Sequence, residues 1–236
     1  MKIILPVAGR GSRFYPESAY LPKCLIPIQG KLMIEWALAS IWHQPEDVMV
    51  IYHADQNPLI SCALRGLLPL ATLIEQTSEL QGAAHTVFQA SNDWKLEKDV
   101  VVVDCDINAV SRYNCTNWNT FTGDGSVLSF RSYDPSKSYI LDKNGFVHRI
   151  IEKNVVSSRA VGGIYHFRSG IELYKAIDKQ ITKHRTVKGE YYLSETVNIY
   201  LKKNPQFRFF EAERFYDNGT SDDVRRFEQF SYDFTT

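Results

Sequence analysis

The feature that most constrains this chain is the abrupt end of its first apolar segment. Residues 3–7 form an apolar run, and the small and basic residues 8–13 (Ala-Gly-Arg-Gly-Ser-Arg) follow at once. Such a run is typical of a buried parallel strand, and glycines after it let several backbone N–H groups approach a phosphate chain. Arg13 and Lys23 would add the positive charge that a triphosphate needs. We therefore expect a phosphate-binding loop after the first strand.

The two glycines alone are equally consistent with an ordinary tight turn. Phe14 stands where the dinucleotide fingerprint has its third glycine, and no Gly-Lys-Ser/Thr sequence follows, so neither common phosphate-loop motif matches. The longer pattern is more specific. Gly9, Gly11, Ser12 and Arg13 are followed about ten residues later by Pro-Lys and the apolar segment 25–28.

Composition excludes several kinds of partner. Lys plus Arg and Asp plus Glu number 27 each in 236 residues, so neither nucleic acid nor an anionic membrane is expected to bind. Four cysteines without a Cys-x-x-Cys pair predict reduced thiols in a cytoplasmic protein, with no signal region and no membrane span. The length fits a single domain over 1–236. The sequence does not set the oligomeric state, so a homo-oligomer stays open.

Strand and helix patterns alternate in the first half. Strands are expected at 3–7, 47–52, 71–75 and 99–104, and helices at 32–41, 57–66 and 82–91. Repeated strand–helix units predict an α/β fold with a mostly parallel central sheet and helices on both faces. Ligands of such sheets bind outside the carboxyl ends of the strands, where the loop 8–13 and the acids at 104–106 both fall.

The second half changes character after residue 125. Its β-branched and aromatic segments predict strands, and the Asp-Lys-Asn-Gly sequence at 142–145 predicts a hairpin turn. Strands are expected at 126–133, 159–167 and 206–211, strand segments on either side of the hairpin turn within 139–153, and helices at 169–184, 194–203 and 221–230. Thr220 and Asp223 are expected to cap the last helix. We expect these strands to form a small antiparallel, substrate-facing subdomain over the same sheet.

Asp104, Cys105 and Asp106 close the most hydrophobic strand of the chain. Paired carboxylates there suit Mg²⁺, which prefers oxygen ligands, although acids also mark strand ends in solvent. Asp-x-Asp after a buried strand is also what metal-dependent glycosyltransferases use to hold a nucleotide sugar. A glycosyltransferase expels no pyrophosphate, however, and does not need the cationic pattern of Arg13 and Lys23.

The N-terminal pattern resembles that of the nucleotidyltransferases that make nucleotide sugars, the sugar-1-phosphate pyrophosphorylases. Their pattern is Gly-x-Gly-Ser/Thr-Arg, about ten residues, Pro-Lys, then Leu-Ile-Pro. Residues 4–9 (Ile-Leu-Pro-Val-Ala-Gly) are most similar to the branch that activates glucose with UTP. The resemblance implies a Rossmann-like fold, with a nucleotide-binding half over 1–110 and an acceptor-binding half over 111–236.

The resemblance also implies a Mg²⁺ site made by two distant acids. Asp106 matches the acid of the family's Gly-Asp strand end. Asp217, within Phe-Tyr-Asp-Asn-Gly-Thr at 215–220, matches the acid of the family's Trp-x-Asp-x-Gly-Thr sequence. Without the resemblance, residues 217–219 predict only a turn before a helix.

The remaining roles follow from the same resemblance. Arg13 is expected to contact the leaving phosphates and Lys23 the α-phosphate as catalytic residues. The expected nucleotide-binding residues are Ala8, Gly9, Gly11, Ser12, Gln76, Gln81, Gly82 and Asp104. The expected acceptor-binding residues are Glu152, Lys153, Gly163 and Glu190.

The implied activity is the condensation of a nucleoside triphosphate with a sugar 1-phosphate, or a similar phosphorylated acceptor, for the synthesis of surface glycans. Three alternatives stay open: a cytidylyltransferase for a non-sugar phosphate, an Asp-x-Asp glycosyltransferase, and a non-catalytic nucleotide-binding partner. The last is kept open by Asn154 and Val161, which stand where the family has proline and asparagine. The base of the nucleotide cannot be read from the sequence.

Overall fold

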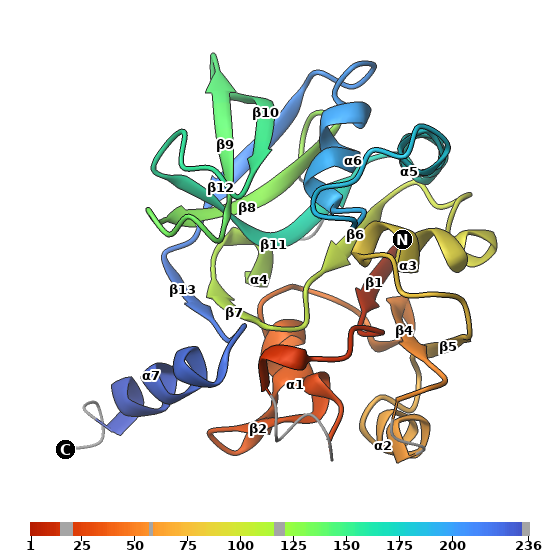
Figure 1. Cartoon of the computed structure of the whole chain (residues 1–236), viewed down its shortest axis with the longest axis vertical. Coiled ribbons are helices and arrows are strands. Elements are labelled where there is room, and N and C mark those ends of the chain that lie inside the picture. The colour runs from red at the N-terminus through yellow and green to blue at the C-terminus, as the bar shows by residue number, and fades with distance from the viewer. Residues whose placement is uncertain (15–20, 57–58, 116–120, 233–236) are drawn as a thin grey trace.

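One large sheet organises the molecule. A computed structural model of the chain describes residues 1–14, 21–56, 59–115 and 121–232. Within these ranges nine strands form one sheet (Figure 1). Seven of them follow the order β10-β9-β11-β6-β1-β4-β5, and the other two branch from it, because β8 pairs with β11 and β12 pairs with β8. The strands are β1 (Lys2–Pro6), β4 (Val48–His53), β5 (Thr72–Gln76), β6 (Val100–Val103), β8 (Gly125–Arg131), β9 (Ser138–Lys143), β10 (Phe146–Glu152), β11 (Arg159–Phe167) and β12 (Phe207–Glu211).

The first half of the sheet is parallel and the second half is mostly antiparallel. β6, β1, β4 and β5 are all parallel neighbours. β11 then pairs antiparallel with β6, with Ile164 opposite Val103. The hairpin β9–β10 turns through Asn144 and Gly145, whose φ angles of 55° and 79° are those that an Asn-Gly turn favours. The predicted fold class is confirmed, and the antiparallel strands continue the central sheet.

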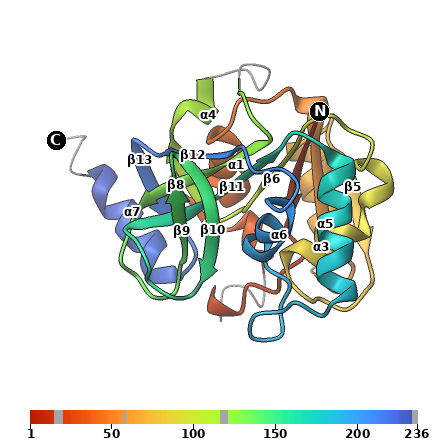
Figure 2. The same ribbon diagram turned by 90° about the horizontal axis from the view of Figure 1, so that it is seen from above.

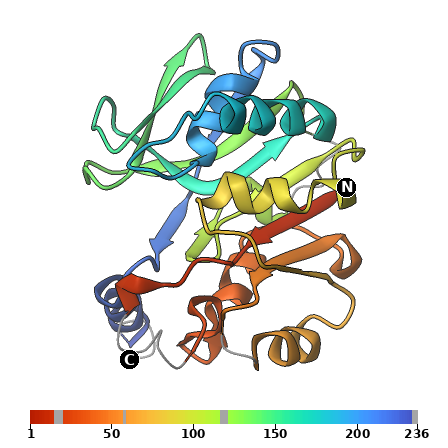
Figure 3. The same ribbon diagram turned by 45° about the vertical axis from the view of Figure 1, so that its right-hand side comes forward.

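Helices cover both faces of the sheet, as predicted. α3 (Ala83–Gln89), α5 (Gly170–Thr182) and α6 (Leu193–Tyr200) pack on one face (Figures 2 and 3). α1 (Met33–Ala39), α2 (Leu59–Leu67) and α4 (Arg112–Cys115) belong to the other. Side chains of a strand alternate between these layers: Ile4 of β1 joins the first core, and Ile3 and Leu5 join the second. Residues 57 and 58 of the helix expected at 57–66 lie outside the described residues.

Two short two-stranded sheets complete the strands, and the sequence predicted neither. β7 (Ile107–Val110) pairs antiparallel with β13 (Arg214–Asp217), and β2 (Pro27–Ile28) pairs with β3 (Lys31–Leu32). Runs of two to four residues are too short to show a strand period. Short 3₁₀ turns lie at η1 (Ser12–Phe14), η3 (Lys23–Leu25), η4 (Pro45–Asp47) and η5 (Ser91–Asp93).

The last helix, α7 (Ser221–Tyr232), begins at the predicted cap. The Asp223 N–H donates to Thr220 Oγ1 at 3.2 Å, which satisfies one of the free N–H groups of the first turn. Val224 and Phe227 then pack against a small cluster that contains Phe14 and Met33. The helix therefore connects the C-terminal segment to the loop that follows β1. None of the helices in the described ranges combines the length and apolarity needed to cross a bilayer.

The packing predicts that the core beneath α6 contributes strongly to stability. Phe167 is fully buried, and its ring centroid lies 5.1 Å from that of Tyr200 and 5.7 Å from that of Phe207. We expect Phe167→Ala to lower the free energy of unfolding by about 3–5 kcal/mol, because the lost side chain leaves a cavity. Leu96, which is 83% exposed, is the control. Urea unfolding should show a change of about 0.5 kcal/mol or less for Leu96→Ala; a similarly small loss for Phe167→Ala would contradict this account.

Candidate active site

A cleft of about 660 Å³ opens where β1 and β6 end, and both halves of the chain line it. The first half contributes the loop after β1 and the acids after β6. The second half contributes side chains from β10, β11, β13 and the loops between them. Nine of the residues predicted for the site line this cleft: Ser12, Arg13, Asp104, Asp106, Glu152, Lys153, Gly163, Glu190 and Asp217.

The pairing of β7 with β13 brings Asp106 and Asp217 together. Asp217 lies opposite Ile107 in the register of this pair, and the Asn218 N–H donates to the Asp106 carbonyl oxygen at 2.7 Å. The two acids are more than a hundred residues apart in the sequence. They therefore become neighbours only through this two-stranded sheet.

Gly219 sits among the charged groups of the site. A Cβ atom placed on it would lie 2.9 Å from Asp217 Oδ1, 3.5 Å from Asp106 Oδ2 and 3.7 Å from Arg13 Nη1. Two carboxylates from different segments and the guanidinium of Arg13 thus surround one point. The missing side chain leaves room for them to converge.

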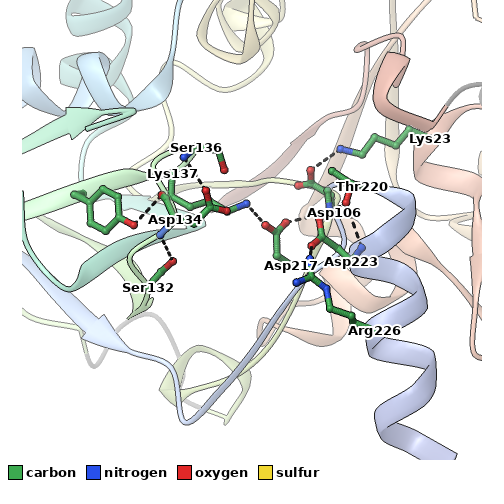
Figure 4. Close-up of polar contacts among 12 residues, drawn as sticks. Lys23, Asp106, Ser132, Asp134, Ser136, Lys137, Asp217, Thr220, Asp223 and Arg226 are labelled. Carbon is green, nitrogen blue, oxygen red and sulfur yellow. Dashed lines mark hydrogen bonds and ion pairs between the residues drawn. The ribbon is translucent and has the colours of Figure 1, made fainter. Parts of the chain in front are cut away.

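Each acid is paired with a lysine in the described structure (Figure 4). Lys23 Nζ lies 2.5 Å from Asp106 Oδ2, and Lys137 is paired with Asp217 Oδ2. Burial opposes the charge on Lys23, but the Asp106 carboxylate outweighs it and raises the lysine pKa. Burial likewise disfavours the charged form of Asp106, but Lys23 and then Arg13 lower its pKa overall. Both members of this pair are therefore charged at neutral pH.

The opposite wall carries the residues predicted to hold the acceptor. Glu152 accepts hydrogen bonds from Ser138 Oγ at 2.5 Å and from Ser194 Oγ at 2.6 Å. Lys153 has a positive φ of 53°, and its Nζ donates to the Tyr192 hydroxyl at 2.5 Å and lies 4.5 Å from the centre of that ring. Burial, and then a hydrogen bond with Glu190, raise the pKa of Tyr192, so its hydroxyl stays protonated.

The other predicted residues lie around the cleft without lining it. Lys23 reaches the site through Asp106. Ala8, Gly9 and Gly11 follow β1, where Gln56 Nε2 donates to the Val7 carbonyl at 2.8 Å and braces the loop. The remaining three lie between the end of β5 and the start of α3. Gln76 is the last residue of β5, and Gly82, with a φ of 105°, directly precedes α3. The Gln81 carbonyl accepts a hydrogen bond from the Tyr191 N–H.

The family model described as nucleotidyl transferase matches residues 1–232. The chain belongs to this family. The predicted family is thereby confirmed. Among curated relatives, a bifunctional protein GlmU from Methanococcus maripaludis is 25% identical over 183 residues, which cover 72% of this chain and 41% of that protein. The nucleotidyl transferase chain therefore spans about two fifths of the length of this relative.

Solved structures share the whole fold. The nucleoside-diphosphate-sugar pyrophosphorylase from Vibrio cholerae RC9 has a TM-score of 0.80 at 19% identity, covering 96% of this chain and 99% of that one. The CTP:phosphocholine cytidylyltransferase from Streptococcus pneumoniae has a TM-score of 0.76 at 18% identity, covering 98% of both chains. At these identities the likeness shows the fold of the nucleotidyl transferase and not its substrate.

The carboxylates of this site fit a divalent cation shared with a ligand. No group of three or more His, Cys, Asp or Glu side chains suited to a metal ion occurs among the described residues. Asp106 and Asp217 nevertheless approach one point, and Mg²⁺ is commonly held by one or two carboxylates together with substrate phosphates and water. The donor set thus suits a hard cation that arrives with a phosphorylated ligand.

Asp104 differs from its neighbour Asp106. Its N–H donates to the Gly163 carbonyl at 2.8 Å, and a Cβ on Gly163 would lie 2.8 Å from Asp104 Oδ2. Burial, followed by the negative charge of Asp106, raises the pKa of Asp104 to about 7 although Lys23 opposes the shift. The two acids of the Asp-x-Asp sequence are therefore not equivalent: Asp106 is charged and Asp104 is half-protonated near neutrality.

Four contacts of the site were not predicted. Lys137, Ser138, Tyr192 and Ser194 line the cleft and contact residues that the sequence had identified. A lone lysine or serine beside a hairpin carries no pattern of its own. Tyr192 lies two residues after Glu190, and that proximity was the only available signal.

The raised pKa of Asp104 predicts a pH-dependent effect of Asp104→Asn. An acid whose pKa rises from 3.8 in the unfolded chain to about 7 in the fold stabilises the protein below pH 4, and this contribution is lost as the pH rises to 7. An asparagine at this position does not ionise, so it causes no such loss of stability between pH 4 and pH 7. In EDTA, the variant should therefore gain in unfolding free energy relative to wild type between pH 5 and pH 8. Urea unfolding at several pH values measures this, and parallel stability profiles would show that Asp104 is ionised throughout.

Proposed function

We propose that this nucleotidyl transferase joins a nucleoside triphosphate to a phosphorylated acceptor, most simply a sugar 1-phosphate, and releases pyrophosphate. The observation that carries the proposal is the convergence of Arg13, Asp106 and Asp217 on one point, with Lys23 on Asp106. Lys153 stands on the other wall of the same cleft. An enzyme that brings two phosphorylated substrates together needs cationic groups on both sides.

The reaction is an in-line displacement at the α-phosphorus. An oxygen of the acceptor phosphate forms a new bond to this phosphorus, and the bond to the oxygen bridging to the β-phosphate breaks, so pyrophosphate leaves with the electron pair. The protein aligns the two oxygens and neutralises the charge that develops. In this proposal Arg13 holds the leaving phosphates, Lys23 the α-phosphate and Lys153 the acceptor phosphate.

Asp106 and Asp217 would hold Mg²⁺, which supplies positive charge to the triphosphate when it is bound. The backbone of the loop at 8–12 would cradle the phosphates, and the segment from Gln76 to Gly82 would lie against the base.

We retain the cytoplasm as the expected location, because Cys24, Cys62 and Cys105 are free thiols.

Three observations favour a second candidate, a cytidylyltransferase for a non-sugar phosphate. The carboxylate of Glu152, expected to meet sugar hydroxyls, already accepts from Ser138 and Ser194. Val161 lines the cleft where an amide side chain would offer further hydrogen bonds to a sugar. The fold is also similar to that of a CTP:phosphocholine cytidylyltransferase.

A product screen tests both candidates. ATP, CTP, GTP, UTP and dTTP are each mixed with Mg²⁺ and with glucose 1-phosphate, phosphocholine or glycerol phosphate. Pyrophosphate should appear only when one triphosphate and one acceptor are both present, and the active pair identifies the substrates. A nucleoside diphosphate released from a nucleotide sugar, without pyrophosphate, would indicate a glycosyltransferase. Nucleotide binding without any turnover would indicate a non-catalytic partner.

The assigned roles predict large losses on removal of single charges. Lys23→Ala and Asp106→Ala should each lose about 2.7–4 kcal/mol of transition-state stabilisation, the usual effect of removing one such electrostatic group. Lys98→Ala, at an exposed position outside the cleft, is the matched control and should keep the wild-type kcat/KM. Steady-state pyrophosphate release measures all three variants. Wild-type turnover by either of the first two would refute its role.

A further inference from the structure

Among the described residues of the cleft, Lys137 alone is paired with an expected metal ligand and has no role in the proposed reaction. It lies directly before β9, on the wall opposite η3, and its ammonium is paired with Asp217 Oδ2. In Figure 4, Lys137 and Lys23 approach the two aspartates from opposite sides. The side chains of Lys137 and Asp217 are each 23% exposed, so water and ligands reach the pair.

The loop that carries Lys137 is held by its own hydrogen bonds. The Lys137 N–H donates to the Asp134 carbonyl at 3.1 Å, and the Ser136 N–H donates to Asp134 Oδ1 at 2.8 Å. The Tyr139 hydroxyl donates to the same Asp134 carbonyl at 2.8 Å. These bonds hold the backbone of Lys137 in place, so a change of ion-pair partner requires only rotation of its side chain.

The same backbone touches the acceptor wall. The Lys153 N–H donates to the Lys137 carbonyl at 3.0 Å, so the two lysines start from hydrogen-bonded positions on adjacent segments. Both side chains line the cleft. The Lys153 ammonium donates a hydrogen bond to the uncharged hydroxyl of Tyr192, whereas the Lys137 ammonium forms an ion pair with a carboxylate. Two ammonium groups on hydrogen-bonded segments of one cleft suit a phosphate dianion.

Asp217 cannot bind a cation through both carboxylate oxygens while Lys137 is paired with its Oδ2. Lys137 has to leave the carboxylate before both of its oxygens can act as metal ligands, and a partly exposed ion pair is weak enough to exchange. The released ammonium needs another anion. Lys153, which is expected to hold the acceptor phosphate, lies on the segment that is hydrogen-bonded to Lys137, so the geometry favours this phosphate.

We propose that Lys137 is a second lysine for the acceptor phosphate, stored on Asp217 until the cation and the triphosphate bind. This inference rests on the proposed function. It makes Lys137 a substrate-binding residue whose availability depends on the metal site.

The test compares Lys137→Met and Lys137→Arg with wild type. Lys143→Met is the matched control, because Lys143 is exposed at the far end of the same strand and lies outside the cleft. Mn²⁺ binding is measured without substrates from the electron paramagnetic resonance of free Mn²⁺. The KM values are measured with the active substrate pair from the product screen, and thermal unfolding checks that each variant is folded.

Lys137→Met should bind Mn²⁺ about two- to fivefold more tightly, since Asp217 loses a competing partner. Its acceptor KM should rise about tenfold or more, while the KM for the triphosphate stays within about twofold of wild type. Lys137→Arg keeps the charge and should restore most of the acceptor affinity, and Lys143→Met should change neither quantity.

An unchanged acceptor KM in Lys137→Met would overturn the proposal, even if Mn²⁺ binds more tightly, because Lys137 would then be only a counter-charge for Asp217. Unchanged Mn²⁺ affinity would overturn the storage of Lys137 on Asp217. Failure of the proposed function is a different result: wild type would release no pyrophosphate with any pair. The two failures are therefore distinguished by the activity of the wild-type protein.

Discussion

The site depends on the pairing of two four-residue strands, β7 and β13. This antiparallel pair sets Asp217 opposite Ile107 and lets the Asn218 N–H donate to the Asp106 carbonyl. Backbone hydrogen bonds, and not the repelling carboxylates, hold the two acids close. The arrangement has an electrostatic cost that only counter-charges can offset, since like charges in a partly buried cleft destabilise one another. Everything proposed for the reaction follows from this geometry.

The counter-charges come from separate segments of the chain. Lys23 approaches Asp106 from the 3₁₀ turn η3, Lys137 approaches Asp217 from the loop before β9, and Arg13 lies beside both acids. Each cation is also suited to a phosphate. The acids of the site are therefore paired with the same groups that would bind the substrates. Substrate binding would exchange these ion pairs and would not create buried unpaired charge.

The sequence predicted the long elements and the outline of the site, because these have clear local signals. The apolar run at 99–104 became β6, the Asn-Gly turn became the β9–β10 hairpin, and the loop 8–13 follows β1. It did not predict β7 and β13, which are too short to show a period and exist only as partners of each other. Lys137 was missed for a related reason: its role depends on a neighbour eighty residues away. The family resemblance, and not periodicity, related Asp217 to Asp106.

The most direct test of the account asks whether Asp106 and Asp217 act on the same ion. Steady-state pyrophosphate release is measured for Asp106→Asn, Asp217→Asn and the double variant with the active substrate pair. If both acids ligate one cation, either substitution disrupts the same site, and the double variant should be no slower than the slower single variant within about twofold. If the two losses in kcat/KM multiply, the acids act independently, and the shared cation site at the centre of this account is contradicted.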